Sequence, residues 1–398
     1  MSSHPIQPAS EPPPPLVPRE WHLRLDPLLL LATLGLVACS LIALNGATAN
    51  DIPGKPDYYV MRQGIYAAIG VALMYALSRF DYSRLRELRY PVYGVLIALL
   101  VFVLGIAQAT RGSKAWIELP GFQFQPSELG KVLLIAALGG FVVDRMRRMG
   151  RDTTARIMLL GLFPTMLVIA EPDLGSALVY VAATIAILFV AGAPWRHFAA
   201  LFTLFAVAIT LVLVVAPKVG VQVLEPYQVD RLTSFLHPSA DPGDEGYHQQ
   251  QALTALGSGE KTGRGVAGAT QTSLNFLPEH HTDFIFAAIG ETYGFAGCAL
   301  VLSLYALLIW RGLHILTVAK NLYGALIAGG ITVMLLFQLF VNIGMNVGIM
   351  PITGVTAPLL SFGGSSMLAT FMALGLLHSV HAQARETAEL KGRATVFQ

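Results

Sequence analysis

Charge and cysteine are scarce in this sequence. Only 13% of its 398 residues are Asp, Glu, Lys or Arg, and it has two cysteines, whereas an ordinary soluble domain is about 25% charged. Both Cys39 and Cys298 fall inside apolar runs, which argues against a disulfide framework or a cysteine zinc site. Basic and acidic residues nearly balance, at a net charge of +2, so nothing indicates nucleic-acid binding. These shortages exclude an ordinary soluble enzyme.

Hydrophobic residues take the place of charge. They make up 54% of the chain, and the mean hydropathy is +0.60. A helix that crosses a bilayer needs roughly 20 apolar residues, and runs of about this length recur along the whole sequence. We therefore predict an all-α integral membrane protein with ten transmembrane helices, at about residues 27–46, 60–78, 90–108, 127–143, 157–171, 174–192, 198–216, 283–310, 322–345 and 366–381.

These spans predict one membrane domain, residues 21–381, with a polar segment at each end. Residues 1–20 are rich in proline and are expected to form a disordered cytoplasmic tail, and residues 382–398 a second cytoplasmic tail. The sizeable extramembrane segment is the loop at 217–282, between spans seven and eight. With the N-terminus inside, most of the 26 basic residues fall in cytoplasmic segments, which places both termini in the cytoplasm and the loop outside.

Ionisable residues at membrane depth are the first functional candidates, because each costs about 2.5 to 3.5 kcal/mol at a helix centre. Glu128 and Lys131 are three residues apart at the start of the fourth span, so they share a helix face and can neutralise each other. A structural pair and a catalytic pair fit this spacing equally well. Glu171 and Asp173 flank Pro172 at a predicted turn, and turn formation explains them at least as well as function does.

Asp283 lies where the outer loop meets the eighth span, and the apolar residues Phe284, Ile285 and Phe286 follow it directly. Partly dry surroundings disfavour the charged carboxylate, which suits a general base. Helix N-capping, which Asp favours equally well, is the alternative. Glu291 follows eight residues later on roughly the same helix face and needs a polar partner there.

Several glycine patterns have simpler explanations than cofactor chemistry. Gly-x-Gly-x-x-Gly at 263–268 matches the dinucleotide pattern, but it follows no predicted strand and lies in the outer loop. Gly-Glu-Lys-Thr at 259–262 lacks the glycine that a phosphate loop has before its lysine. The Gly-x-x-x-Gly strings at 290–294 and 344–348 indicate close helix contacts.

His280 and His281 stand close enough to Asp283 to suggest metal ligands at the membrane surface. Two adjacent histidines point in different directions from the backbone, however, so we assign no metal ligand. A divalent metal stays an open alternative, and no other cofactor is expected.

Five of the strings around these residues, in order along ten predicted spans, are specific to one family. The chain resembles the SEDS proteins of the bacterial cell wall, named for shape, elongation, division and sporulation, whose members include RodA and FtsW. The resemblance runs from the first span to the tenth. Its motifs are Phe124-Gln-Pro-Ser-Glu128-Leu-Gly-Lys131, Glu171-Pro-Asp-Leu-Gly175, Phe276-Leu-Pro-Glu-His-His-Thr-Asp-Phe-Ile-Phe286, Pro351-Ile-Thr-Gly354 and Ser361-Phe-Gly-Gly-Ser-Ser366.

This resemblance implies a peptidoglycan glycosyltransferase that polymerises lipid II at the outer face of the inner membrane, paired with a class B penicillin-binding protein. It makes Asp283 the family's essential aspartate, and Glu128 with Lys131 its buried pair. The segment 270–276 is more similar to RodA than to FtsW, so a role in elongation is preferred to one in division. Glu171 points the other way, since RodA proteins often have Gln there.

Two positions depart from the family's common pattern. Gly112 is followed by Ser113, Lys114, Ala115 and Trp116, where many members have a Gly-x-Gln-Arg-Trp string, so the positive charge is shifted and changed in kind. Thr292 follows Glu291 where many members have a second glutamate, which leaves one carboxylate at that place.

The expected reaction needs a base for the acceptor sugar's 4-hydroxyl and cations for the departing undecaprenyl diphosphate, in a groove open to the outer leaflet. The family inverts the anomeric centre, so Asp283 suffices as the one carboxylate. The rival functions are a lipid II flippase, which needs charges spread through several spans, and a scaffold that only recruits a synthase. Residues assigned to the substrate or its diphosphate are Arg111, Lys114, Arg231, Arg264, Glu291 and Ser365.

Overall fold

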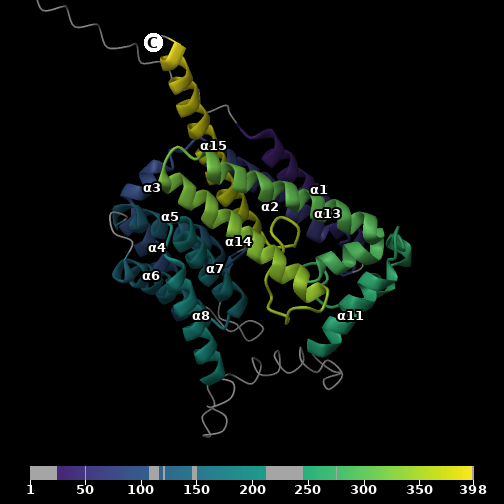
Figure 1. Ribbon diagram of the computed structural model, residues 1–398. Coiled ribbons are helices and arrows are strands. Elements are labelled where there is room, and N and C mark those ends of the chain that lie inside the picture. Colours follow the sequence, from purple (N-terminus) through teal and green to yellow (C-terminus); the bar gives the residue numbers. More distant parts are fainter. Residues whose placement is uncertain are drawn as a thin grey trace, which may run out of the picture.

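The structure is a computed structural model that describes residues 25–49, 51–106, 116–119, 122–145, 150–211, 245–274 and 276–396. Within these ranges the chain is mostly helical, and the helices pack into one bundle (Figure 1). The one sheet of the described residues is an antiparallel pair of short strands, β1 (Ile117–Leu119) and β2 (Phe122–Phe124).

A helix lies over each of the ten predicted apolar runs. Six of these helices are long and apolar enough to cross a membrane, and three more are shorter apolar helices. The all-α membrane class therefore agrees with the structure, while the count of ten spans stays a prediction. The long six are α1 (Pro27–Ala47), α2 (Tyr58–Ser78), α5 (Pro126–Arg145), α6 (Arg151–Ala170), α13 (Ile285–Val318) and α14 (Leu322–Asn346); the others are α4 (Arg89–Ile106), α7 (Leu174–Val190), α8 (Trp195–Thr210) and α15 (Gly364–Val396).

The structure describes only parts of the predicted tails and of the predicted loop, and it differs from the prediction at the C-terminal tail. α15 continues to Val396, so most of the segment assigned to a C-terminal tail prolongs the last helix, whose end projects from the bundle (Figure 1). Residues 1–20 and the first part of the predicted loop, 217–244, lie outside the described residues. The rest of that loop contains α11 (Glu245–Ser258), the 3-10 turn η4 (Val266–Gly268) and α12 (Thr270–Ser273).

Small residues set how closely the central helices approach. α5 is buried along most of its length and contacts α4, α7, α14 and α15. A Cβ added at Gly130 would lie 2.0 Å from the hydroxyl oxygen of Tyr180, and one at Gly139 would lie 3.2 Å from the ring of Tyr323. The missing side chains thus make room for buried tyrosines of neighbouring helices, as is common where helices pack in membranes.

α13 is interrupted, whereas the sequence predicts one continuous span. Gly294 has φ 65° and ψ −160°, which ends one helical segment and starts the next. The glycines near this break accommodate the loop rather than a neighbouring helix: a Cβ at Gly259 would lie 1.8 Å from the carbonyl oxygen of Gly290, and one at Gly263 would lie 2.2 Å from that of Thr292. Close backbone approach therefore explains the 259–262, 263–268 and 290–294 patterns without any nucleotide.

The loop satisfies backbone groups that the break leaves without helical partners. Arg264 N donates to the carbonyl oxygen of Glu291 at 2.9 Å, and Phe295 N donates to that of Glu260 at 2.9 Å. In a bilayer, backbone of this kind is tolerated only where protein or water pairs it. Residues 259–265 and the break are therefore one structural unit.

Farther along α13, Asp26 joins the start of α1 to two other helices. Its carboxylate accepts hydrogen bonds from Leu28 N and Leu29 N, both at 3.0 Å, and so caps α1. Arg311 Nε on α13 donates to the same carboxylate at 3.0 Å, and Asp26 N donates to His378 Nδ1 on α15 at 3.2 Å. The fully buried carboxylate is thus neutralised by a guanidinium, as burial of a charge requires.

Candidate active site

Asp283 lies in the turn that precedes α13. Its backbone N donates to the carbonyl oxygen of Glu279 at 3.1 Å, which closes that turn. The N-cap of α13 is Phe284, without a side-chain capping bond. The N-cap thus falls on the residue after Asp283, and the side chain of Asp283 is half-buried.

Two asparagines of α14 hold the backbone of Asp283. Asn342 Nδ2 and Asn346 Nδ2 both donate to its carbonyl oxygen, at 3.1 and 3.0 Å. Asn346 Oδ1 also accepts from Ala287 N at 3.0 Å. Both asparagines are fully buried. They were not among the predicted site residues, although two amides four residues apart in an apolar helix are a recognisable sign of a polar contact within the bundle.

The segment between α14 and α15 lies against the same turn. Ser361 Oγ donates to the carbonyl oxygen of Thr282 at 2.6 Å, and Phe362 N to that of His281 at 2.8 Å. A Cβ at Gly354, which has φ +72°, would lie 3.9 Å from Asp283 Oδ2. The motifs at 351–354 and 361–366 therefore meet the motif that contains Asp283.

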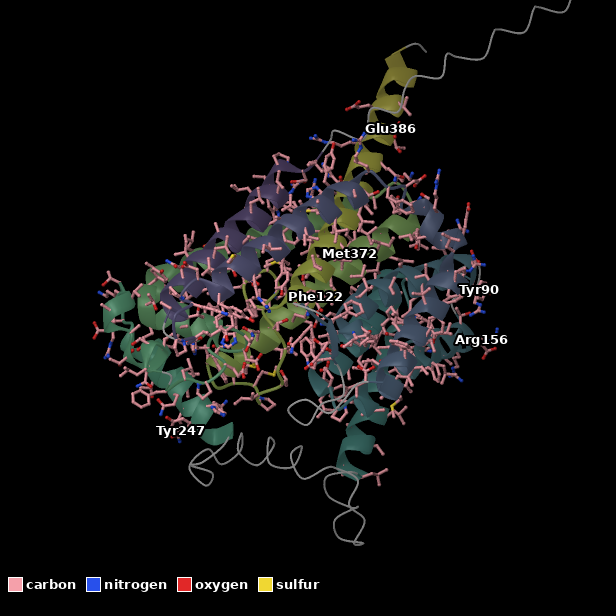
Figure 2. All side chains as sticks on the ribbon, turned by 180° about the vertical axis from the view of Figure 1, so that it is seen from behind. Tyr90, Phe122, Arg156, Tyr247, Met372 and Glu386 are labelled. Atoms are coloured by element: carbon pink, nitrogen blue, oxygen red, sulfur yellow. The ribbon has the colours of Figure 1, made fainter. Side chains whose placement is uncertain are left out.

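Ser365 connects the start of α15 to the start of α5. Its hydroxyl accepts from Gln125 N and donates to the carbonyl oxygen of Gln123, both at 2.9 Å. Phe122 of β2 packs beside Gly364, and it lies near the middle of the bundle (Figure 2). These contacts place Ser365 in the scaffold of the site, and its binding of substrate remains a prediction.

Asp173 links two further motifs. Its Oδ1 accepts from Ser176 N at 2.9 Å and caps α7, while its Oδ2 accepts from Gln125 Nε2 at 2.9 Å. A Cβ at Gly175 would lie 2.6 Å from the carbonyl oxygen of Thr353. All five motif strings, far apart in the sequence, thus converge on one polar centre within the helices.

Glu128 and Lys131 form the ion pair that their spacing predicts. Lys131 Nζ donates to Glu128 Oε1 at 2.6 Å, with side-chain exposures of 3% and 8%. Tyr180 OH donates to the carbonyl oxygen of Ser127 at 3.0 Å, directly before the pair. The contact is confirmed; whether the pair also acts on substrate stays a prediction.

Glu171 follows α6 in the turn before α7 and is fully buried. Burial, and then the negative charge of Asp173, raise its pKa from 4.5 to about 8. At neutral pH the carboxyl group is therefore mostly protonated, which is a reason for a polar but uncharged side chain to be tolerated at this position.

Replacing Glu171 by Gln should remove a pH-dependent loss of stability. The folded-state pKa exceeds the unfolded one, so folding is not penalised below pH 4.5, and the penalty grows until about pH 8, to at most about 5 kcal/mol. Unfolding midpoints between pH 5 and 8 should fall less steeply for Glu171→Gln than for the wild type. Glu118→Gln, at an exposed position on β1, should keep the wild-type slope; equal slopes for all three proteins would contradict the assignment.

The polar partners of Glu291 are residues of the loop that precedes α13. Its carboxylate accepts from Gln271 N at 2.8 Å, from Thr272 N at 3.0 Å and from Thr272 Oγ1 at 2.6 Å. The side chain is fully buried. Both carboxylate oxygens therefore hold α12, and we propose that Glu291 positions the loop rather than binding the diphosphate.

The Glu291→Gln variant should loosen α12, because a carboxamide keeps one acceptor oxygen but turns an N–H group toward the backbone N–H of either Gln271 or Thr272. Hydrogen bonds to a charged group contribute about 1.5 to 3 kcal/mol each, so a lower melting temperature and faster amide exchange at 270–274 are expected. Glu260→Gln, exposed in the same loop, is the control. Unchanged exchange at 270–274 would show that the carboxylate does not hold the loop.

Three of the four basic residues predicted to bind the diphosphate lie outside the part of the chain that the structure describes. Arg111, Lys114 and Arg231 lie outside the described residues. Arg264 is exposed, and its Nε donates to the carbonyl oxygen of Ser258 at 3.1 Å. It belongs to the loop that pairs with the α13 break, so its contact with a diphosphate remains a prediction.

A bundle of apolar helices in which carboxylates, buried amides and an ion pair meet is that of a multi-pass membrane protein. A sequence model of the FtsW/RodA/SpoVE family, described as cell cycle protein, matches residues 23–386. The chain therefore belongs to this family.

Two relatives named as peptidoglycan glycosyltransferases, MrdB and FtsW, are similar to the chain. It is 35% identical over 360 residues to the peptidoglycan glycosyltransferase MrdB of Escherichia coli K12, covering 90% of this chain and 94% of that protein. It is 37% identical over 384 residues to a probable peptidoglycan glycosyltransferase FtsW of Thioalkalivibrio sulfidiphilus, covering 94% and 93%. A solved chain from a peptidoglycan synthase complex that coordinates polymerization and crosslinking matches with a TM-score of 0.76 at 34% identity, over 91% and 99% of the two chains.

Proposed function

We propose that this chain is a peptidoglycan glycosyltransferase that polymerises lipid II. The observation that carries the proposal is the convergence of the five motif strings around Asp283, in a chain whose relatives are named for this activity. The relatives named MrdB and FtsW are about equally similar. We favour the elongation role on segment 270–276, with a divisome role as the alternative.

The proposed step is an inverting displacement. Asp283 takes the proton of the acceptor sugar's 4-hydroxyl as that oxygen bonds to the anomeric carbon of the donor. The bond from that carbon to the diphosphate breaks, and undecaprenyl diphosphate leaves with the electron pair. Asn342 and Asn346 fix the backbone of the base, and outer-side cations stabilise the leaving group.

The proposed setting is a ten-span protein with both termini in the cytoplasm and the loop outside the inner membrane. The basic residues of the connections support this orientation. We propose that a class B penicillin-binding protein crosslinks the product; the similar solved chain comes from a synthase complex that coordinates polymerization and crosslinking, which supports a crosslinking partner.

Polymerisation in sealed vesicles tests the function against the flippase alternative. Lipid II supplied only at the outer leaflet should become glycan polymer without an ion gradient or ATP. Vesicles that translocate labelled lipid II yet make no glycan, even with a cognate class B partner, would refute the glycosyltransferase and favour the flippase.

A further inference from the structure

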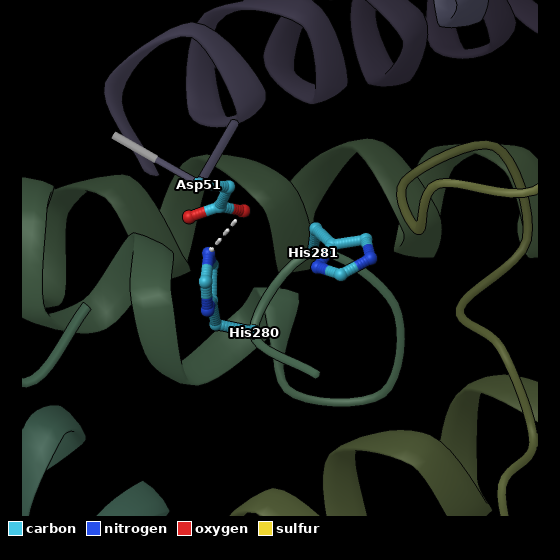
Figure 3. A group of neighbouring side chains, drawn as sticks. All are labelled: Asp51, His280 and His281. Carbon is cyan, nitrogen blue, oxygen red and sulfur yellow. Dashed lines mark ion pairs between the residues drawn. The ribbon is translucent and has the colours of Figure 1, made fainter. Parts of the chain in front are cut away.

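Beside Asp283, the turn before α13 brings two histidines to an aspartate from a distant part of the chain. Asp51 lies in the connection between α1 and α2, and its carboxylate faces His280, with His281 next to them (Figure 3). The metal set considered from the sequence used Asp283 with these histidines; the structure assembles Asp51 with them instead. One ligand atom of each residue lies within 4.8 Å of those of the other two.

The orientation of His280 leaves a metal-binding nitrogen aimed at the carboxylate. Its Nδ1 is 2.9 Å from the carbonyl oxygen of Leu277, which only accepts, so the proton of the neutral ring belongs on Nδ1. A ring N–H on a backbone carbonyl is the usual support of a metal-bound histidine. The lone pair of Nε2 then points to Asp51 Oδ2, 3.2 Å away.

Two electron-rich atoms at this distance require a positive charge between them. The side chains of His280 and Asp51 are 4% and 10% exposed, so water screens them little. Nε2 of His280 and Oδ2 of Asp51 are within ion-pair distance. Either a proton on Nε2 or a metal ion can supply the charge, and the second fits the third side chain as well.

His281 is held beside this pair by aromatic rings. Its ring centroid is 4.5 Å from that of Tyr59 and 5.9 Å from that of Phe362. Around a tetrahedral ion with bonds of about 2.0 to 2.1 Å, ligand atoms are separated by about 3.3 Å. His280 and Asp51 already meet this spacing, and the ligand atom of His281, within 4.8 Å of theirs, has to approach by at most about 1.5 Å.

We propose that Asp51, His280 and His281 bind one divalent transition-metal ion of the Zn²⁺ class. Two imidazole nitrogens and one carboxylate oxygen suit Zn²⁺ and neighbouring transition metals, whereas Mg²⁺ prefers oxygen ligands and keeps its water. The fourth position is left open. The ion ties the connection between α1 and α2 to the turn that carries Asp283, so it positions that turn from outside the proposed glycosyl-transfer step.

Metal binding by the full-length protein in detergent, after treatment with a chelator, tests this site. Calorimetric titration should show one Zn²⁺ per chain with micromolar or tighter affinity, undiminished by excess Mg²⁺. His280→Ala, His281→Ala and Asp51→Asn should each weaken binding by about tenfold or more. His248→Ala, which removes a half-buried histidine of α11, should bind as the wild type does.

X-ray absorption at the zinc edge of the wild-type protein provides a readout that does not depend on any variant folding. Histidine scattering, with Zn–N distances of about 2.0 to 2.1 Å, is expected. Absence of binding, a spectrum without histidine, or full binding by His280→Ala would overturn the site and leave a protonated His280 paired with Asp51. None of these results depends on glycan synthesis, so failure here is distinguishable from failure of the proposed function.

Discussion

Asp283→Asn is expected to abolish glycan polymer while the protein still folds and binds its partner. The backbone of residue 283 is fixed through its own amide and carbonyl groups, by Glu279, Asn342 and Asn346. A carboxamide therefore keeps these contacts and the size of the side chain but cannot accept the proton of the acceptor hydroxyl. Loss of a general base reduces the rate by about 10² to 10⁴-fold.

The measurement is polymerisation of purified lipid II, alongside thermal unfolding and capture of a class B partner. Asp57→Asn, at an exposed carboxylate before α2, makes the same chemical change away from the site and should retain full activity. Polymer at the wild-type rate from a folded Asp283→Asn protein would remove Asp283 from the mechanism.

The second large effect concerns the ion pair of Glu128 and Lys131. Removing either partner leaves the other charge buried, which costs about 3 to 5 kcal/mol. Glu128→Ala and Lys131→Ala should both lower the melting temperature strongly. Arg86→Ala, which removes a half-exposed partner of Asp144, should change stability by no more than about 1 kcal/mol.

The double variant Glu128→Gln with Lys131→Met separates a structural role from a catalytic one. It removes both charges and keeps similar volumes, so stability should return toward that of the wild type. Recovered polymerisation would identify a purely structural pair. A stable protein without activity would instead show that the charges act on substrate.

Structural features that depend only on neighbouring residues, such as apolar runs and helical spacing, could be predicted from the sequence. A helix covers each apolar run because about 20 apolar residues leave the backbone few other ways to pair in a membrane. The contact between Glu128 and Lys131 follows from helical spacing alone. Asp283 is marked by its place at the edge of an apolar run, although its position before the N-cap was not foreseen.

Features that depend on contacts between distant segments could not be predicted. No pattern near Asp51 in the sequence predicts its contact with His280, and none near Glu291 predicts its hydrogen bonds to the start of α12. The break at Gly294 was not foreseen because the helix as a whole is apolar enough to cross a membrane, and the Gly-x-x-x-Gly string at 290–294 fits a close helix contact equally well. In each case the partner is chosen by the packing of the whole bundle.

The interrupted helix α13 also bears on how the protein is made. The amide and carbonyl groups that lack helical partners near Gly294 are hydrogen-bonded to residues 259–265, which the ribosome synthesises before α13. In the proposed topology this segment must already have crossed the membrane when α13 leaves the translocon. Two fragments of the chain, expressed separately, should therefore reassemble into a folded protein when the cut lies between α14 and α15. They should not reassemble when the cut lies between residues 265 and 285, because α13 would then enter the membrane with the backbone groups at its break unpaired.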